Sequence, residues 1–295
     1  MSNILKSCTL CPRNCKVNRY EQFGYCKAPG KLKLALASLH NWEEPCISGD
    51  FGSGTIFFSN CNMGCVYCQN YKISSGYGKM ITVKRFAQIC IELQNKNAHN
   101  INLVTPTPYV PLIIKGIREA KRLGLYIPIV YNTSSYENVE TIKMLDQTVD
   151  IYLADLKYYE DKYAVKYSNT SNYFEYATKA IEEMYNQVGT PIIENGLMKK
   201  GIIVRVLLLP GLLEDAKKII KYLYDKYRDD IFISIMNQYT PVRKLKFEGL
   251  NNKVSEESYN ELINYACDLG ITNAFIQEGE TQLESFIPNF NKQGI

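Results

Sequence analysis

Short apolar segments alternate with amphipathic segments along most of the chain, and this alternation constrains the fold more than any other feature. Six runs are apolar over almost their whole length, which is the pattern of parallel strands buried on both faces of a sheet. These runs are Thr55–Ser59, Ile101–Val104, Ile127–Tyr131, Asp150–Ala154, Ile202–Leu209 and Ile231–Met236, and a shorter one, Asn273–Gln277, follows them.

The segments between these runs repeat apolar residues at three- and four-residue spacing, as amphipathic helices do. Ser255 precedes Glu256 and Glu257 in the arrangement of an N-cap and an acidic first helical turn. The apolar stripes are Val83, Phe86, Ala87, Cys90 and Leu93; Val110, Ile113, Ile114 and Ile117; Ala216, Ile219, Ile220 and Leu223; and Tyr259, Leu262, Ile263 and Ala266.

Repeated strand-then-helix units predict an α/β fold with a parallel sheet and right-handed crossovers. Six units followed by a helix and a strand favour a parallel β/α barrel, complete or partial, and an open doubly wound sheet is the alternative. Both architectures bind ligands at the carboxyl ends of their strands. The tail, residues 288–295, is expected to be loose.

The composition bounds the class of protein. The 295 residues are 46% hydrophobic and 22% charged, and 34 basic side chains face 30 acidic ones for a net charge of +4. This balance argues against nucleic acid or an anionic membrane as the main partner. Because the start lacks an apolar signal segment and no run is long enough to span a membrane, we expect a cytoplasmic protein.

Eight of the ten cysteines fall within the first 68 residues. In a reducing compartment cysteines are more often metal ligands or catalytic groups than disulfides, and their clustering favours metal. Residues 1–50 are irregular and rich in Cys, Pro and Gly, typical of a small unit held together by metal. We therefore divide the chain into a Cys-rich metal-binding segment, 1–50, and a β/α domain, 51–295.

Cys61, Cys65 and Cys68 follow the first apolar run with the spacing C-x3-C-x2-C. Three thiolates on one short loop can hold one face of a cubane cluster and leave the fourth iron open, as a catalytic metal site requires. A zinc site closed by a remote residue, such as His40 or His99, is the alternative interpretation.

Four further cysteines have the spacing C-x2-C-x3-C-x10-C. Four thiolates can close a tetrahedral zinc site or hold a second iron–sulfur cluster, and spacing does not separate the two. A redox-active pair at the first two positions is a third interpretation. These cysteines are Cys8, Cys11, Cys15 and Cys26.

The three-cysteine loop resembles that of the radical S-adenosylmethionine (SAM) superfamily, in which an aromatic residue precedes the last cysteine, as Tyr67 does here. Within that superfamily the chain is similar to proteins described as homologues of pyruvate formate-lyase activating enzyme. The supporting stretches are Cys8–Cys15, Gly52–Phe58, His99–Thr107 and Asp150–Lys157.

This resemblance implies a partial β/α barrel with a [4Fe-4S] cluster whose open iron binds SAM. One-electron reduction, by a partner such as flavodoxin or ferredoxin, then releases a 5′-deoxyadenosyl radical that abstracts hydrogen from a substrate. That substrate is either a glycine of a glycyl-radical enzyme, as for an activase, or a small molecule or another peptide. A non-catalytic iron–sulfur or zinc electron-transfer protein is the rival hypothesis.

Polar residues at the strand ends are candidates for binding SAM. Thr105 and Thr107 occupy the place where activating enzymes carry a Gly-Gly-Glu segment for the SAM amino group; a plain turn is the alternative. Asn132 and Ser134 follow the third run, where they could contact ribose or cap a helix.

Charged residues follow at the next two strands. Asp155 and Lys157 share one face by strand alternation, and the resemblance implies that Lys157 pairs with the SAM carboxylate. A structural ion pair is the alternative. Arg205 is flanked by apolar residues and must be paired, either with the cofactor or with a neighbouring Asp.

Two positions depart from the family pattern. Pro108 and Val206 stand where relatives are expected to carry His, so a changed reaction is one expectation. His40, Glu43 and Glu44 precede the first apolar run. They either line the entrance of the site or form a solvated charged loop, which is the more common explanation for such a cluster.

Overall fold

The computed structural model describes residues 4–277, 282 and 287–295. Its described strands form one sheet in the order β10-β9-β8-β6-β5-β4-β2-β1-β3, with β7 paired to β8 outside this path. The strands are β1 Leu32–His40, β2 Ser53–Phe58, β3 Lys79–Ile81, β4 Ile101–Val104, β5 Ile129–Thr133, β6 Ile151–Asp155, β7 Ile192–Glu194, β8 Leu197–Leu207, β9 Phe232–Met236 and β10 Ala274–Ile276.

The expected α/β fold with a mostly parallel sheet is confirmed. From β2 to β10 the neighbouring strands along this path run parallel, whereas β1 pairs antiparallel with both β2 and β3 at one edge. Among the described strands, no pairing joins β10 to β3. The predicted runs all become strands because their residues are apolar on both faces, and every residue of β2, β4 and β5 is buried.

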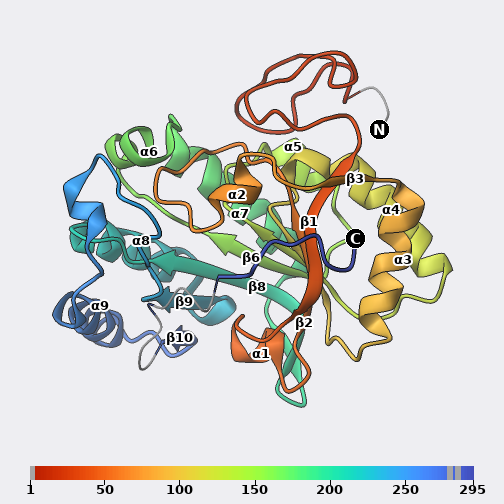
Figure 1. The fold of residues 1–295 in the computed structure, drawn as a ribbon. Helices are drawn as coiled ribbons and strands as arrows, with labels where there is room; N and C mark the ends of the chain where they lie inside the picture. Colours follow the sequence, from red (N-terminus) through yellow and green to blue (C-terminus); the bar gives the residue numbers. More distant parts are fainter. Residues whose placement is uncertain (1–3, 278–281, 283–286) are drawn as a thin grey trace.

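The helices are placed as their apolar stripes predict. The stripe residues from Val110 to Ile117 and from Ala216 to Leu223 are buried, and the Ser255 hydroxyl caps α9 by accepting from Ser258 N. In Figure 1, α3 and α4 lie at the right of the view, and α8 and α9 lie at the left. The helices are α1 Pro45–Ser48, α2 Tyr71–Ser74, α3 Val83–Gln94, α4 Val110–Arg122, α5 Val139–Lys143, α6 Asp161–Ser168, α7 Tyr173–Val188, α8 Leu213–Tyr227 and α9 Glu256–Asp268.

Two expectations about the ends of the chain are wrong. Part of the segment expected to be irregular, residues 32–40, is β1, whose apolar residues are covered by the core while its backbone pairs with β2. The tail is not loose: Ala37 N donates to Gln293 O at 3.0 Å and Lys292 N donates to Ala35 O at 3.1 Å. Phe290 also packs on Phe57, so the tail covers the part of β1 that β3 leaves unpaired.

A hairpin that the strand pattern alone does not predict joins β7 to β8. Asn195 and Gly196 both have positive φ angles, 52° and 77°, as a type I′ turn requires. The Asn-Gly pair is a sequence signal for this turn. Because of this hairpin, β8 begins at Leu197, before the predicted start at Ile202.

No helix among the described residues combines the length and the apolar composition needed to cross a membrane.

The contact between α3 and α4 depends on a glycine. A Cβ atom added at Gly116 would lie 2.3 Å from Cδ1 of Phe86, a fully buried ring. We therefore expect Gly116→Ala to lower the free energy of unfolding by about 1–3 kcal/mol, because overpacking outweighs the better helix propensity of Ala. Denaturant unfolding measures this. Gly249→Ala, where no atom lies within 4 Å of the added Cβ, is the control; equal stability of the two variants would contradict the packing argument.

Candidate functional site

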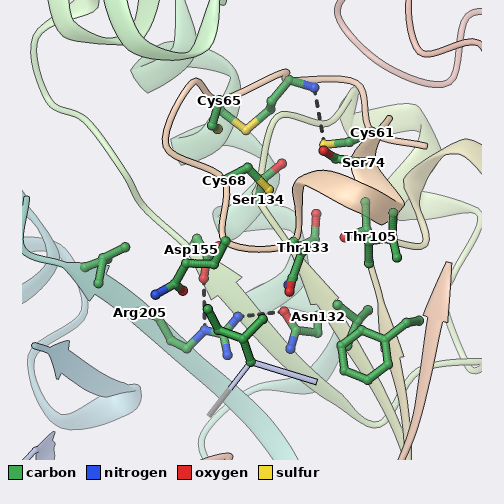
Figure 2. A pocket seen from close by; sticks show the side chains of 18 of the residues that line it. Cys61, Cys65, Cys68, Ser74, Thr105, Asn132, Thr133, Ser134, Asp155 and Arg205 are labelled. Atoms are coloured by element: carbon green, nitrogen blue, oxygen red, sulfur yellow. Dashed lines mark hydrogen bonds and ion pairs between the residues drawn. The ribbon is translucent and has the colours of Figure 1, made fainter. Parts of the chain in front are cut away.

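A cavity of about 250 Å³ lies at the carboxyl ends of the parallel strands. Its wall is built from the loop after β2 and from the ends of β4, β5, β6, β8 and β9 (Figure 2). The structure brings together at this cavity all the predicted residues of the three-cysteine loop and the strand ends: Cys61, Cys65, Cys68, Tyr67, Thr105, Thr107, Asn132, Ser134, Asp155, Lys157 and Arg205.

The three-cysteine loop leaves β2 through Asn60, which has a positive φ of 73° and turns the chain over the cavity. All three thiols are free, and all three line the cavity. Met63 N lies 3.5 Å from Cys61 Sγ, and Ser168 Oγ donates to Cys65 Sγ at 2.9 Å.

This donor set fits a cubane cluster held by three thiolates, with one iron left toward the cavity. Among the residues that the structure describes, no group of three or more His, Cys, Asp or Glu side chains is already arranged to hold a metal ion. Cluster binding at this loop would therefore require the thiols to turn toward a common centre, and their place on one short loop and one cavity wall allows it.

The Cys-rich segment holds the backbone of this loop. Arg13 donates to the carbonyl oxygens of Asn62 and Met63 at 3.0 and 3.2 Å, and the Tyr25 hydroxyl donates to Met63 O at 2.9 Å. The Arg13 guanidinium stacks on the Tyr25 ring at 3.7 Å. Next to this contact, an added Cβ at Gly64, which has a φ of 90°, would lie 3.0 Å from the Tyr25 hydroxyl. Arg13 and Tyr25 of the Cys-rich segment therefore hold the backbone of the three-cysteine loop in place.

The predicted second metal set lies within this segment. Cys8 exchanges backbone hydrogen bonds with Lys16 and Val17, next to Cys15, and Tyr25 N lies 3.4 Å from Cys15 Sγ, next to Cys26. Burial raises the pKa of Cys11 to about 12, and the nearby thiols of Cys26 and Cys8 add to that rise. The structure thus brings the four cysteines into one neighbourhood.

The backbone changes direction sharply where β4 ends at the cavity. Thr105 has a φ of 60°, a rare conformation for a β-branched residue and a mark of local strain. Its amide donates to Asn132 O at 3.0 Å, which fixes the two strand ends to each other. Thr107 begins a short 3₁₀ helix that leads into α4.

Behind this wall lies Glu137, a buried carboxylate that sequence analysis missed. Its Oε1 accepts hydrogen bonds from Thr107 at 2.6 Å, Thr133 at 2.7 Å and Tyr131 at 3.1 Å. Burial raises its pKa to about 7, although the three hydroxyls favour the charged form. A threonine hydroxyl that donates here has only lone pairs left for the cavity, so this wall is suited to a ligand with N–H donors.

At the far side of the cavity an ionic network joins three strands. Arg205 donates to Asp155 at 2.9 Å, to Glu43 at 3.1 Å and to Asn132 at 2.6 Å, and Lys157 donates to Asp155 at 2.6 Å. In Figure 2 the Arg205 guanidinium lies between Asp155 and Asn132. Arg205 was predicted to pair with the cofactor or with a neighbouring Asp, and in the structure it pairs with Asp155.

The charges of this network stabilise one another. Burial alone would raise the pKa of Asp155, but Lys157 and Arg205 outweigh burial and hold it below its usual value. Burial alone would lower the pKa of Lys157, but Asp155 keeps it above its usual value. For Glu43 burial is the larger effect, and its pKa is raised despite Arg205.

One expectation about flanking residues needs correction. Glu43 and Glu44 are not part of a solvated loop: Glu44 is buried, Glu43 pairs with Arg205, and His40 lines the cavity. Pro108 and Val206 are buried and neither lines the cavity. Strand alternation turns Val206 away from the face of Arg205, so residue 206 lies outside this site.

Sequence analysis also missed Tyr158 and Ser168, which lie next to the three-cysteine loop. The hydroxyl oxygens of Tyr158 and Tyr67 lie 2.7 Å apart, as do those of Tyr158 and Ser168. Neither Ser168 nor Glu137 belongs to a sequence motif or a periodic pattern that would have predicted its place. Only the packing of the folded chain brings their segments to this region.

A family model described as the radical SAM superfamily matches residues 55–223. An uncharacterised protein of Methanocaldococcus jannaschii is 30% identical over an alignment of 277 residues, and the match covers 90% of this chain and 75% of that protein.

A solved structure with a TM-score above 0.5 shows the same fold at low identity. The FeFe-hydrogenase maturase HydG from Carboxydothermus hydrogenoformans aligns with a TM-score of 0.51 and 12% identity over 77% of this chain and 53% of that chain, so the match spans about half of its length. A domain of pyruvate-formate lyase-activating enzyme from Bacteroides vulgatus aligns with a TM-score of 0.43 and 18% identity over 59% of this chain and 94% of that one.

The raised pKa of Glu137 predicts a pH-dependent stability. Between its ordinary pKa of 4.5 and its folded pKa of about 7, the folded chain keeps a proton that the unfolded chain loses. Stability is therefore lost as pH rises through this window, by roughly 3 kcal/mol in total. We expect Glu137→Gln to abolish this loss, measured as unfolding free energies at pH 5 and pH 8. Glu140→Gln, at an exposed position, is the control. A stability difference between wild type and Glu137→Gln that stays constant with pH would contradict the assignment.

Proposed function

The chain belongs to the radical SAM superfamily, and we propose that it cleaves SAM reductively at the cavity described above and abstracts hydrogen from a substrate. Membership makes it an enzyme of the radical SAM type and implies a [4Fe-4S] cluster and SAM as cofactors. When bound, these supply the electron and the C5′–S bond whose cleavage yields methionine and a 5′-deoxyadenosyl radical.

The observation that carries the proposal is the position of Cys61, Cys65 and Cys68 on one wall of a cavity whose other walls carry complementary polar groups. The three thiolates would hold three irons. An electron-transfer protein needs no such ligand cavity beside its cluster, which counts against the rival hypothesis.

Lys157 is suited to the carboxylate of SAM. It donates one of its three N–H groups to Asp155, and the ammonium lines the cavity. Arg205 has a different role in this proposal: its Nε and both terminal nitrogens are engaged with Asp155, Glu43 and Asn132. It orients Asp155 and Asn132, and its two remaining N–H groups are left for the cofactor.

The amino group of SAM would lie at the opposite wall. Thr107 and Thr133 donate hydrogen bonds to Glu137 through their hydroxyls. Their oxygens keep lone pairs for the cavity, one of them on Thr133, because Ser135 N already donates to that oxygen. These two hydroxyls and the backbone around Thr105 would replace the Gly-Gly-Glu segment that this chain lacks. Asn132 and Ser134, next to them, would contact the ribose.

For the substrate, we propose a glycine in a glycyl-radical partner protein, with flavodoxin or ferredoxin as reductant. The support is the resemblance of four separate stretches to activating-enzyme homologues. A small molecule or another peptide is the alternative, and product analysis with candidate substrates separates them: an activase generates a protein-based glycyl radical.

Removing one cysteine of the loop tests the chemistry. After anaerobic reconstitution with iron and sulfide, wild type with dithionite and SAM should form 5′-deoxyadenosine. We expect Cys65→Ala to lower this product at least a hundredfold, because the cluster loses a ligand. Cys267→Ala, an exposed cysteine outside both sets, should retain wild-type activity and iron content. A wild type that binds a full cluster and never cleaves SAM would overturn the proposal.

We further propose that Cys8, Cys11, Cys15 and Cys26 bind a second metal, zinc or an iron–sulfur cluster. The segment has few buried apolar residues of its own, Leu5 and Leu10 among them, so cross-linking by metal would account for its order.

Metal analysis tests this second site. We expect a Cys8→Ala/Cys11→Ala variant to lose the metal equivalents of the segment, zinc or iron, while the iron bound by the Cys61 loop remains. Elemental analysis of the purified protein distinguishes the two metals. Unchanged metal content in the variant would refute the site.

A further inference from the structure

Buried hydroxyls lead from the cavity wall to a cluster ligand. Tyr67 lies beside Tyr158 with 2.7 Å between their hydroxyl oxygens, and Ser168 Oγ lies 2.7 Å from the Tyr158 hydroxyl on its other side. Ser168 then donates to Cys65 Sγ at 2.9 Å. Tyr158 and Ser168 are fully buried, so water does not replace these contacts.

The packing of α6 fixes the position of Ser168. It is the last residue of α6, and the helix ends at Asn169 in the left-handed conformation. The residue before Ser168 is tied to the cluster loop, because Val66 N donates to Tyr167 O at 2.8 Å. The serine and Cys65 are therefore held together by backbone contacts as well as by their own hydrogen bond.

The direction of the hydrogen bond follows from the acceptor. A metal-bound thiolate can only accept, so Ser168 must be the donor to Cys65. Each hydroxyl has one proton, so Ser168 then accepts from Tyr158, and Tyr158 in turn accepts from Tyr67. Burial holds the pKa of Tyr158 well above its usual value, so this hydroxyl stays protonated. The contact of Ser168 with Cys65 is much shorter than that of Met63 N with Cys61, 2.9 against 3.5 Å.

We propose that Ser168, positioned by Tyr158, raises the reduction potential of the cluster by donating a hydrogen bond to the Cys65 thiolate. The inference rests on the proposed function, since it needs a cluster at this loop. Reduction adds one negative charge to the cluster and its thiolates, so a donor to sulfur stabilises the reduced form more than the oxidised form.

The helix itself acts in the opposite direction. The carboxyl end of α6 carries partial negative charge and would make reduction harder. The Ser168 hydroxyl places a positive hydrogen between that end and Cys65. Ser168 is thus a positioning residue that acts through a cluster ligand and need not touch SAM or the substrate.

The test is a redox titration of the reconstituted full-length protein, followed by electron paramagnetic resonance in the absence of SAM. We expect Ser168→Ala to lower the ratio of reduced to oxidised cluster at a fixed potential about tenfold, which is a shift of ~59 mV to more negative potential. Iron and sulfide content should equal that of wild type.

Two variants separate the hydrogen bond from a general disturbance of α6. Ser168→Thr keeps the hydroxyl and should retain the wild-type potential. Thr170→Val removes a buried hydroxyl that bonds to Ala164 O at the same helix end without touching Cys65, and it should also leave the potential unchanged.

The outcomes are distinct. An unchanged potential in Ser168→Ala with an intact cluster overturns this inference and leaves the proposed function standing. If Ser168→Ala holds too little cluster to titrate, Tyr158→Phe provides the measurement: a smaller negative shift supports the inference, and no shift overturns it. A wild type that binds no cluster overturns both proposals.

Discussion

The buried guanidinium of Arg205 is the constraint on which the site depends. Its strand, β8, pairs in register with β6, so that Arg205 stands opposite Asp155, and Asn132 reaches it from β5. A buried charge must be paired, and removing one partner leaves the others uncompensated, at a cost of about 3–5 kcal/mol. Glu43, in the loop after β1, pairs with Arg205 and lines the cavity, so this ion pair holds the loop at the cavity wall. The same ion pairs therefore join strands, close the floor of the cavity and orient Lys157.

A second set of contacts joins the Cys-rich segment to the cluster loop. Arg13 and Tyr25 bind the carbonyl oxygens of Asn62 and Met63, and Arg19 donates to the carbonyls of Ala28, Pro29 and Pro108. The cluster loop is thus held from outside by this segment and from inside by α6 through Ser168. A loop that must keep three thiols near one point needs such support, because a short loop has no core of its own.

The sequence predicts most of the parallel sheet, since strands buried on both faces need continuous apolar runs, and it predicts the candidate ligands, since each follows such a run directly. It does not predict β1 as a strand or the ordered tail, because both depend on an edge of the sheet that exists only after folding. The Asn195-Gly196 turn was readable from the sequence, because only residues that tolerate positive φ form it without strain.

What the sequence by itself determined is local: the fold class, the spacing of Cys61, Cys65 and Cys68, and the polar character of the strand ends. These depend on periodicity and on chemistry carried by neighbouring residues. Only the tertiary structure decided that Arg205 faces Asp155 and Glu43, that Glu137 lies behind Thr107 and Thr133, and that Ser168 reaches Cys65. Each of these contacts joins segments distant along the chain or separated by a loop. Their geometry comes from strand order and helix packing, which no local pattern encodes.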